Sequence, residues 1–464
     1  MKLGLYINLC AVKYINMLEK YIDKEIYKKI FKLGAPISLQ ALMNFSIALT
    51  DTFMMGRLGD GAISAAYMGN QVQLLLNFFI MGVDGTVLAL ASRSFGKKDS
   101  SGVKRIFSVG LFFALLTAGI LTAVCCFFPS SVVSLFTNNK AVVSDGARYL
   151  LLLAPSFPFF ALTNIIIAME KSVESTKIGF ITAFFAFSLN FILNYIFIFG
   201  NFGFPRLEIR GAALATLITR ISEAVLAILI SAFNKKFKVK LRDLRADKES
   251  IKLFFSYGYP IILGQVAWSA NQLFAAAIIG RQGSASFGAA MSVAAALGNL
   301  SYVATNGASG ALGIITGKAI GENKQDYIKR IITSSQFLFI ALGFATALII
   351  QLFKFPFISA YKLSKEAKEV AFGFINILSL TSIGTCYQSS MLTGLFKSLG
   401  DVKFVLRTEV FSIFFLIMPL TLASLRLGAS VYTIYFLLKI DQIAKCLPAA
   451  LRLNKIQKKN RKSL

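Results

Sequence analysis

Long apolar runs are the feature that most limits what this chain can fold into. Windows of about 20 apolar residues recur along the 464 residues, and each is long enough to cross the hydrocarbon core of a bilayer as a helix. Backbone groups in lipid must be hydrogen-bonded within the segment, which favours helices. The sequence therefore predicts an all-α polytopic membrane protein with twelve transmembrane helices. They centre near residues 45, 76, 117, 159, 189, 222, 267, 300, 342, 382, 414 and 440.

The distribution of charge predicts the orientation of these helices. The chain has 49 Lys and Arg against 22 Asp and Glu, a net charge of +27 that in a soluble protein would suggest a nucleic-acid partner. Here 35 of the basic residues lie in the amino-terminal segment, in alternate connectors and in the tail, and 11 lie in the opposite connectors. By the positive-inside rule both termini are cytoplasmic in a cell membrane. The basic tail is then a topology signal, and we expect lipid contacts and no nucleic-acid partner.

The histidine and cysteine content narrows the chemistry. The chain has no histidine, and its five cysteines show no metal-binding or disulfide spacing. This excludes histidine-based metal sites, Ser-His and Cys-His nucleophiles and a histidine proton relay. We therefore predict no metal, no cofactor and no enzymatic activity, since a membrane-embedded enzyme would need such a cluster. Proton chemistry near neutral pH would have to use a carboxylate.

The chain also repeats itself once. Three segments of the first half have a similar partner in the second: FKLGAPISL (31–39) and FSYGYPIIL (255–263), VKRI (103–106) and IKRI (328–331), KSVESTK (171–177) and KSLGDVK (397–403). The members of each pair are separated by nearly the same length of chain. The repeat therefore predicts two six-helix lobes that enter the membrane from the same side. The substrate path is expected between them, as in parallel-repeat transporters.

The repeat divides the chain into five predicted parts. These are a cytoplasmic leader with an interfacial helix (1–33), an amino-terminal lobe of spans 1–6 (34–233), a cytoplasmic loop (234–255), a carboxyl-terminal lobe of spans 7–12 (256–450) and a basic cytoplasmic tail (451–464). The interfacial helix rests on the amphipathic pattern of residues 21–32.

Several motifs carry a resemblance to a known family. The pattern P-x-x-x-Q…DTxMxGRLG at 36–59, SLNFILNYIFIFG at 188–200, FGFPRLEIRGAALATLI at 202–218 and GLFKSLGDVK at 394–403 resemble the multidrug and toxic compound extrusion (MATE) family. Their details are closer to the DinF-type and other bacterial branches than to the NorM-type. The resemblance implies a secondary antiporter that exports organic, often cationic and amphipathic compounds in exchange for H⁺ or Na⁺.

Asp51 is the leading candidate for the cation-coupling residue. An ionisable side chain inside a spanning helix is costly, about 2.5–3.5 kcal/mol or more at mid-bilayer, so it marks a functional site. Burial favours the neutral carboxyl group, which could take up a proton on one side and release it on the other. The repeat places Ala275 at the equivalent position, so the acid is not a packing feature of both lobes. The resemblance implies the same coupling role.

A polar cluster accompanies Asp51 in the amino-terminal lobe. Asn190 and Asn194 lie one turn apart on one helix face and are candidates for the coupling site. Some relatives carry Asp at the position of Asn194, so its absence here favours H⁺ over Na⁺. Interhelical hydrogen bonding alone is the alternative role. Candidates for the substrate cavity in this lobe are Gln40, Asn44 and Tyr67.

The carboxyl-terminal lobe lacks the carboxylate pair of the NorM-type coupling site. Trp268 and Cys386 stand at the two positions where the resemblance predicts acids. Trp268, with Gln265 and Asn271 on the same span, could instead offer an aromatic face to an organic cation. Packing in the core or at the membrane interface is an equal alternative for this tryptophan.

The remaining charged residues of the spans have simpler roles. Asp84 is a possible inner gate residue. Two pairs stand three and four residues apart on their helices, which lets each pair neutralise itself: Arg220 with Glu223 and Asp441 with Lys445. We expect structural ion pairs there and an interfacial position for Glu409.

A flippase for lipid-linked oligosaccharides is the alternative function. Its cavity should be rich in Arg to hold a pyrophosphate, and the predicted spans contain only Arg220, close to Glu223. We therefore expect a monomeric antiporter for small organic substrates that works by alternating access.

Overall fold

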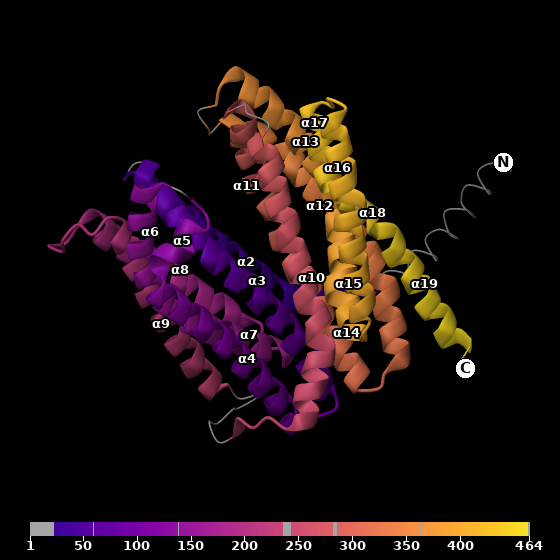
Figure 1. The fold of residues 1–464 in the computed structure, drawn as a ribbon. Coiled ribbons are helices and arrows are strands. Elements are labelled where there is room, and N and C mark those ends of the chain that lie inside the picture. The colour runs from indigo at the N-terminus through magenta and orange to yellow at the C-terminus, as the bar shows by residue number, and fades with distance from the viewer. Residues whose placement is uncertain are drawn as a thin grey trace. The chain divides into compact units, whose positions relative to one another are not determined.

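The computed structural model describes residues 23–58, 60–137, 139–234, 243–281, 285–359, 361 and 363–462. Every regular element in these ranges is a helix (Figure 1). Nine helical segments of the described chain are long and apolar enough to cross a membrane. This confirms the predicted all-α polytopic membrane class, whereas the count of twelve spans stays a prediction. The leader up to residue 22, most of the basic stretch of the linker, and residues 463–464 lie outside the described residues.

The chain forms two compact units. One consists of Pro36–Ser269, and the other joins Met1–Ala35 to Ala270–Leu464. The predicted lobes begin at residues 34 and 256, and these bounds stay a prediction. Both divisions between the compact units fall inside helices, within α2 (Lys24–Gly56) and α10 (Lys248–Arg281). Each of these helices therefore contributes to both units, which a division into whole spans does not anticipate.

The unit Pro36–Ser269 contains most of α2 and α10 and the helices between them. These are α3 (Asp60–Gly96), α4 (Ser100–Phe127), α5 (Pro129–Ser134), α6 (Lys140–Leu153), the 3-10 turn η1 (Ala154–Ser156), α7 (Phe157–Ser172), α8 (Lys177–Phe199) and α9 (Ile209–Phe233). Their core is a cluster of buried side chains that includes Val83, Phe107, Leu150, Phe157 and Ile165.

Local sequence signals explain where several of these helices begin and end. Asp99 caps α4, because its carboxylate accepts the backbone N–H of Gly102 at 2.8 Å. Gly200 ends α8 in the left-handed region, at φ 76°, where a side chain would be strained. Pro155 and Pro158 lie at the junction of α6, η1 and α7, since proline cannot donate the helical hydrogen bond.

The other unit contains α11 (Ala285–Gly321), α12 (Gln325–Ser359) and α13 (Lys365–Ser389), followed by shorter pieces. These are the π-helix η3 (Ser390–Phe396), α14 (Lys397–Leu399), α15 (Val402–Phe411), the π-helix η4 (Ser412–Ile417), α16 (Met418–Arg426), α17 (Val431–Lys439), α18 (Asp441–Ala444) and α19 (Cys446–Lys462). Part of its core is an aromatic stack of Phe374 on Tyr435, with ring centroids 4.2 Å apart. The helices that follow Lys365 are thus interrupted by π-turns and short breaks.

The predicted interfacial helix is not a separate element. From Lys24 its residues are the first turns of α2, which continues through Pro36 without a break. This segment packs on α12 of the same unit: Arg330 forms an ion pair with Asp23 at 2.5 Å, and the Tyr27 hydroxyl donates to the carbonyl of Ser334. These contacts attach the start of α2 to α12, and the interfacial location stays a prediction.

The basic tail is helical as far as Lys462, as the continuation of α19. Arg452 forms two hydrogen bonds to the carboxylate of Asp401, at 2.6 and 3.1 Å, and lies over the ring of Phe404. The ion pair with Asp401 holds the pKa of the Arg452 guanidinium above its ordinary value. The first turns of the predicted tail are therefore attached to α15 and the residue before it.

Candidate functional site

Asp51 lies against the two asparagines of α8. The side-chain amide of Asn194 donates to Asp51 Oδ1 at 2.5 Å and to Asn190 Oδ1 at 3.0 Å. The two asparagines meet because they are four residues apart on one helix, which places them on the same face. The sequence predicted these three residues as one site, and the structure brings them together.

This site is buried on the side of α8 and partly open on the side of α2. Asn190 and Asn194 are 1% and 0% exposed, whereas Asp51 is half-buried. The Oδ1 atom of Asn194 is buried and accepts no hydrogen bond in the described part of the chain. A protonated Asp51 would offer an O–H donor, and rotation of the Asn194 amide would let its oxygen accept it. The arrangement can therefore satisfy a charged and a neutral Asp51.

An ion pair on α9 adjoins this site. Arg220 Nη1 lies 2.6 Å from Glu223 Oε2, and the guanidinium stands 5.1 Å from the centre of the Phe160 ring. Arg220 also interacts electrostatically with Asp51. Glu223 is the acid that Arg220 binds directly, and the half-buried guanidinium acts on Asp51 only through its electric field.

A second charged network lies in the carboxyl-terminal half. Lys445 Nζ donates to Asp441 Oδ2 at 2.9 Å and to Glu409 Oε2 at 2.6 Å. Glu409, for which the sequence predicts an interfacial position, is a partner of this buried lysine. The contact joins α15 to the residue that follows α18, which its spacing to Arg407 does not indicate.

Amides extend this network to α13. Gln442 donates to Asp441 Oδ2 at 2.9 Å and accepts from the side chain of Gln388 at 2.9 Å. Gln388, Asp441 and Gln442 are all at most 6% exposed. The Oδ1 atom of Asp441 is buried and has no described hydrogen-bond donor.

Glu170 is a buried acid that no sequence pattern indicated. It is fully buried at the end of α7, where the Ser231 hydroxyl donates to Oε1 at 2.6 Å and the Asn234 amide donates to Oε2. In the sequence it stands directly before Lys171, where the loop that leads to α8 is near. The contact with α9 depends on long-range packing, which local signals do not report.

The other candidates of the amino-terminal lobe have differing surroundings. Gln40 is buried, and its Oε1 atom has no described hydrogen-bond partner, whereas Asn44 is exposed. The side chain of Tyr67 lies outside the described residues. Asp84 is half-buried and takes part in an interaction. None of these placements tests a role in a substrate cavity or a gate.

The candidates on α10 fall in different units. Trp268 and Gln265 belong to Pro36–Ser269, and the Trp268 ring packs edge-on against Phe78 with centroids 5.5 Å apart. Asn271 belongs to the other unit, where it is buried. All three stand on the one helix α10, and their role in a substrate cavity stays a prediction.

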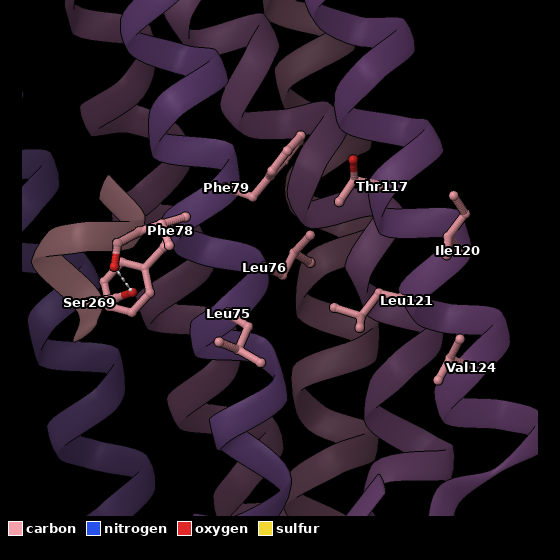
Figure 2. Close-up of a pocket in the computed structure, with 10 residues that line it drawn as sticks. Leu75, Leu76, Phe78, Phe79, Thr117, Ile120, Leu121, Val124 and Ser269 are labelled. Atoms are coloured by element: carbon pink, nitrogen blue, oxygen red, sulfur yellow. Dashed lines mark hydrogen bonds between the residues drawn. The ribbon is translucent and has the colours of Figure 1, made fainter. Parts of the chain in front are cut away.

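An apolar cavity of about 390 Å³ lies between α3, α4 and α10 in the unit Pro36–Ser269 (Figure 2). Figure 2 shows the hydroxyl-bearing side chains Thr117 and Ser269 among aliphatic and aromatic neighbours. The described residues that line it are Leu75, Leu76, Phe78, Phe79, Thr117, Ile120, Leu121, Val124, Val266 and Ser269. Such a lining binds apolar groups and provides no charged partner.

The described residues contain no group of three or more Cys, Asp or Glu side chains placed to hold a metal ion. Two buried acids of the spans, Glu223 and Asp441, are instead bound to bases. The prediction that no metal or cofactor is required stays a prediction.

The family model described as MatE matches residues 36–196 and 260–422 of this chain. One match falls in each half of the internal repeat, and each begins near the start of its half. Together they cover well over half of the chain.

Similar proteins agree with this match. A protein of Thermotoga maritima named "Probable multidrug resistance protein NorM" is 23% identical over 389 residues and covers 83% of each chain. "Probable multidrug resistance protein YoeA" of Bacillus subtilis is 23% identical over 406 residues, which are 85% of this chain and 86% of that one. The predicted closeness to the DinF-type branch stays a prediction.

Solved structures show the same fold. The Vibrio cholerae MATE transporter VcmN in the bent form aligns with a TM-score of 0.82 at 18% identity, over 93% of this chain and 97% of that one. A MOP superfamily transporter from Pyrococcus furiosus aligns with a TM-score of 0.84 at 17% identity, over 94% and 98%. With the family model matched in both halves, this chain belongs to the MatE family, the multidrug and toxic compound extrusion transporters, and is a membrane transporter rather than an enzyme.

Proposed function

We propose that this chain is a secondary antiporter that exports organic cationic or amphipathic compounds in exchange for protons. The observation that carries the proposal is the contact of Asp51 with Asn194, an ionisable residue of a spanning helix bound to a buried amide. A carboxyl group in such surroundings can exist in two charge states with different hydrogen bonds. That difference is what couples a proton to a change of conformation.

Alternating access would depend on the different hydrogen bonds of ionised and protonated Asp51. Ionised Asp51 accepts the N–H of Asn194, which ties α2 to α8. Protonation replaces this charge-assisted bond with a weaker neutral one and favours a different packing of α2. The resulting shift would open the transporter to the other side and lower its affinity for the exported cation. Release of the proton to the cytoplasm restores the first state.

The donor set favours H⁺ over Na⁺ as the coupling ion. A hard cation binds several oxygen ligands, whereas Asn194 presents an N–H group to the carboxylate. Its second N–H is used by Asn190, whose oxygen is therefore occupied. A proton needs only the carboxylate oxygen.

The substrate class rests on the names of the relatives and on the cavity. Two relatives are named as probable multidrug resistance proteins. The cavity between α3, α4 and α10 would accept the apolar part of an amphipathic compound. Arg220 is already bound to Glu223, so it does not favour the pyrophosphate of a flippase substrate. We further propose a functional monomer in the cell membrane with both termini in the cytoplasm.

Transport in everted membrane vesicles tests this proposal. Ethidium export should follow an imposed pH step and not a Na⁺ step, and Asp51→Asn should abolish it. Asp145→Asn is the matched control, since Asp145 is exposed and forms only a long ion pair with Arg148 at 3.9 Å. Proton-driven export that survives Asp51→Asn would contradict the mechanism, and export that follows only a Na⁺ step would change the coupling ion.

A further inference from the structure

The carboxyl-terminal network and the ion pair on α9 each contain one base, and the two bases stand at equivalent positions of the repeat. Arg220 and Lys445 are separated by the same length of chain as Ile106 and Ile331, which end the similar segments VKRI and IKRI of the repeat. Each base lies in the last span of its half and binds an acid of the same span, at 2.6 Å for Glu223 and at 2.9 Å for Asp441. The two halves therefore each have one buried base with a partner in its own span.

In each half a second acid comes from another span. Asp51 on α2 interacts electrostatically with Arg220, and Glu409 on α15 lies 2.6 Å from Lys445. The position equivalent to Glu409 in the first half is Phe184, so this acid is not a remnant of the repeat. Only in the second half do two carboxylates bind the same cation, because Glu409 and Asp441 both form ion pairs with Lys445. One negative charge remains without a bonded counter-charge, which is expensive in a membrane interior.

We propose that Glu409, Lys445 and Asp441 form a second proton-binding site, which takes up one proton in each transport cycle. The inference rests on the proposed proton-coupled export and adds a site to it. A proton from the outer water binds one carboxylate oxygen, so that one neutral and one ionised carboxyl group face the ammonium group. Its release to the inner side restores the excess charge, and no bond other than this O–H forms or breaks.

The geometry favours a proton over a metal cation at this site. The ammonium group of Lys445 lies within 2.9 Å of both carboxylates and occupies the space that a cation would need. Asp441 Oδ1 is buried and accepts no described hydrogen bond, so an acceptor is present without its donor. A proton supplies charge at this oxygen without adding volume.

Other titratable and polar groups face the network from neighbouring helices. Tyr302 on α11 interacts electrostatically with Asp441, Glu409 and Lys445, and Lys439 at the end of α17 interacts with Asp441. Lys439 is half-buried and forms no ion pair with a described residue. The positive charge of Lys439 lowers the electrostatic free energy of the excess negative charge. It does not replace an ion pair with either carboxylate. The Cys446 thiol also interacts electrostatically with Asp441 and donates to the carbonyl of Gln442. The amides of Gln442 and Gln388 are further contacts.

The helices that carry the network are irregular where they meet it. The π-helix η4 begins at Ser412, just after Glu409, and the π-helix η3 begins at Ser390, just after Gln388. α17 ends shortly before Asp441, where α18 starts. Single π-turns are frequent at functional sites. A change of charge at the network could therefore move these helices, because a π-turn can exchange its backbone hydrogen bonds for those of an α-helix.

The number of protons exchanged per substrate tests the proposal. The full chain is reconstituted in proteoliposomes without a membrane potential, and ethidium accumulation is measured at equilibrium against a pH difference of about one unit. Exchange of two protons predicts an accumulation ratio of about 100, and exchange of one predicts about 10, because each proton contributes one factor of ten. This equilibrium ratio does not depend on how fast or how stable a variant is.

Glu409→Gln should lower the ratio from about 100 to about 10. Glu322→Gln is the matched control, because Glu322 belongs to the same unit and pairs with Lys324 outside the spans. If Glu409→Gln is not monodisperse, Asp441→Asn replaces it, since it also leaves one carboxylate facing Lys445.

The outcomes separate this site from the proposed function. A wild-type ratio of about 10, or an unchanged ratio of about 100 in Glu409→Gln, overturns the second site and leaves proton-coupled export intact. Absence of any pH-driven accumulation in the wild type overturns the proposed function itself.

Discussion

Asp51 and Glu409 each lie near a base that binds another acid, but they differ in what they touch directly. Asp51 contacts a neutral amide, and its base Arg220 is bound to Glu223. Glu409 contacts the ammonium group of Lys445 itself. An acid next to an amide can change its charge without leaving a cation unpaired. The comparison predicts that the first half responds to protons mainly through a hydrogen bond, and the second through an ion pair.

Removal of the lysine tests this difference with the largest expected effect. Lys445→Met leaves Asp441 and Glu409 buried without their cation, which should destabilise the protein by about 3–5 kcal/mol. Thermal unfolding of the purified protein in detergent measures the loss. Glu409→Gln in the same molecule should recover part of it, because one uncompensated acid is then removed. An unchanged melting temperature of Lys445→Met would show that the network is not an ion pair in the folded protein.

The packing that holds Asp441 in place is expected to be the next most sensitive. A Cβ atom on Gly384 would lie 2.3 Å from the carbonyl oxygen of Gln442, so Gly384→Ala must displace α18. Overpacking of this kind costs about 1–3 kcal/mol. Gly298→Ala is the control, since its Cβ would approach only Leu378, at 3.4 Å. Equal melting temperatures for the two variants would contradict the close contact.

The hydrogen bond at Asp51 should have a smaller effect, seen in transport. Asn194→Ala removes the donor to the ionised carboxylate and should slow proton-driven ethidium export about tenfold, the equivalent of about 1.4 kcal/mol. Asn190→Ala removes no contact to Asp51 and should slow export less. The two export rates are compared in vesicles. If Asn194→Ala is slower than Asn190→Ala, the contact to Asp51 matters more than the general packing of α8, and the reverse order would contradict this.

The smallest effect is expected for a change at Asp99, an acid outside the predicted spans. Its surroundings contrast with those of Asp51 and Glu409. Hydrogen bonds from the Ser101 hydroxyl and the Gly102 amide hold the pKa of Asp99 below its ordinary value. Because the pKa is lower in the folded state, this stabilisation is present at neutral pH and is lost as the pH falls through the folded value. Asp99→Ala should therefore cost about 1 kcal/mol at pH 7 and less in acid. A loss in melting temperature that is independent of pH would argue against the cap.

Much of the fold could be predicted because apolar length and repeated motifs are local signals. The spanning segments and the repeat follow from the sequence, and the family model matches each half of the repeat separately. The cluster of Asp51, Asn190 and Asn194 could also be predicted, since an acid and two amides in apolar spans must find polar partners. The burial of Glu170 and the ion pair of Glu409 could not, because each depends on a residue far away in the sequence.

The sequence by itself determined the membrane class, the two homologous halves and the candidates Asp51, Arg220 and Lys445. These follow from the cost of placing polar groups in lipid, which leaves few alternatives for each residue. Only the tertiary structure decided that Glu409 joins Lys445 and that α2 and α10 each contribute to both compact units. Such contacts join residues that are far apart in the sequence, and they depend on the packing of whole helices rather than on any local pattern.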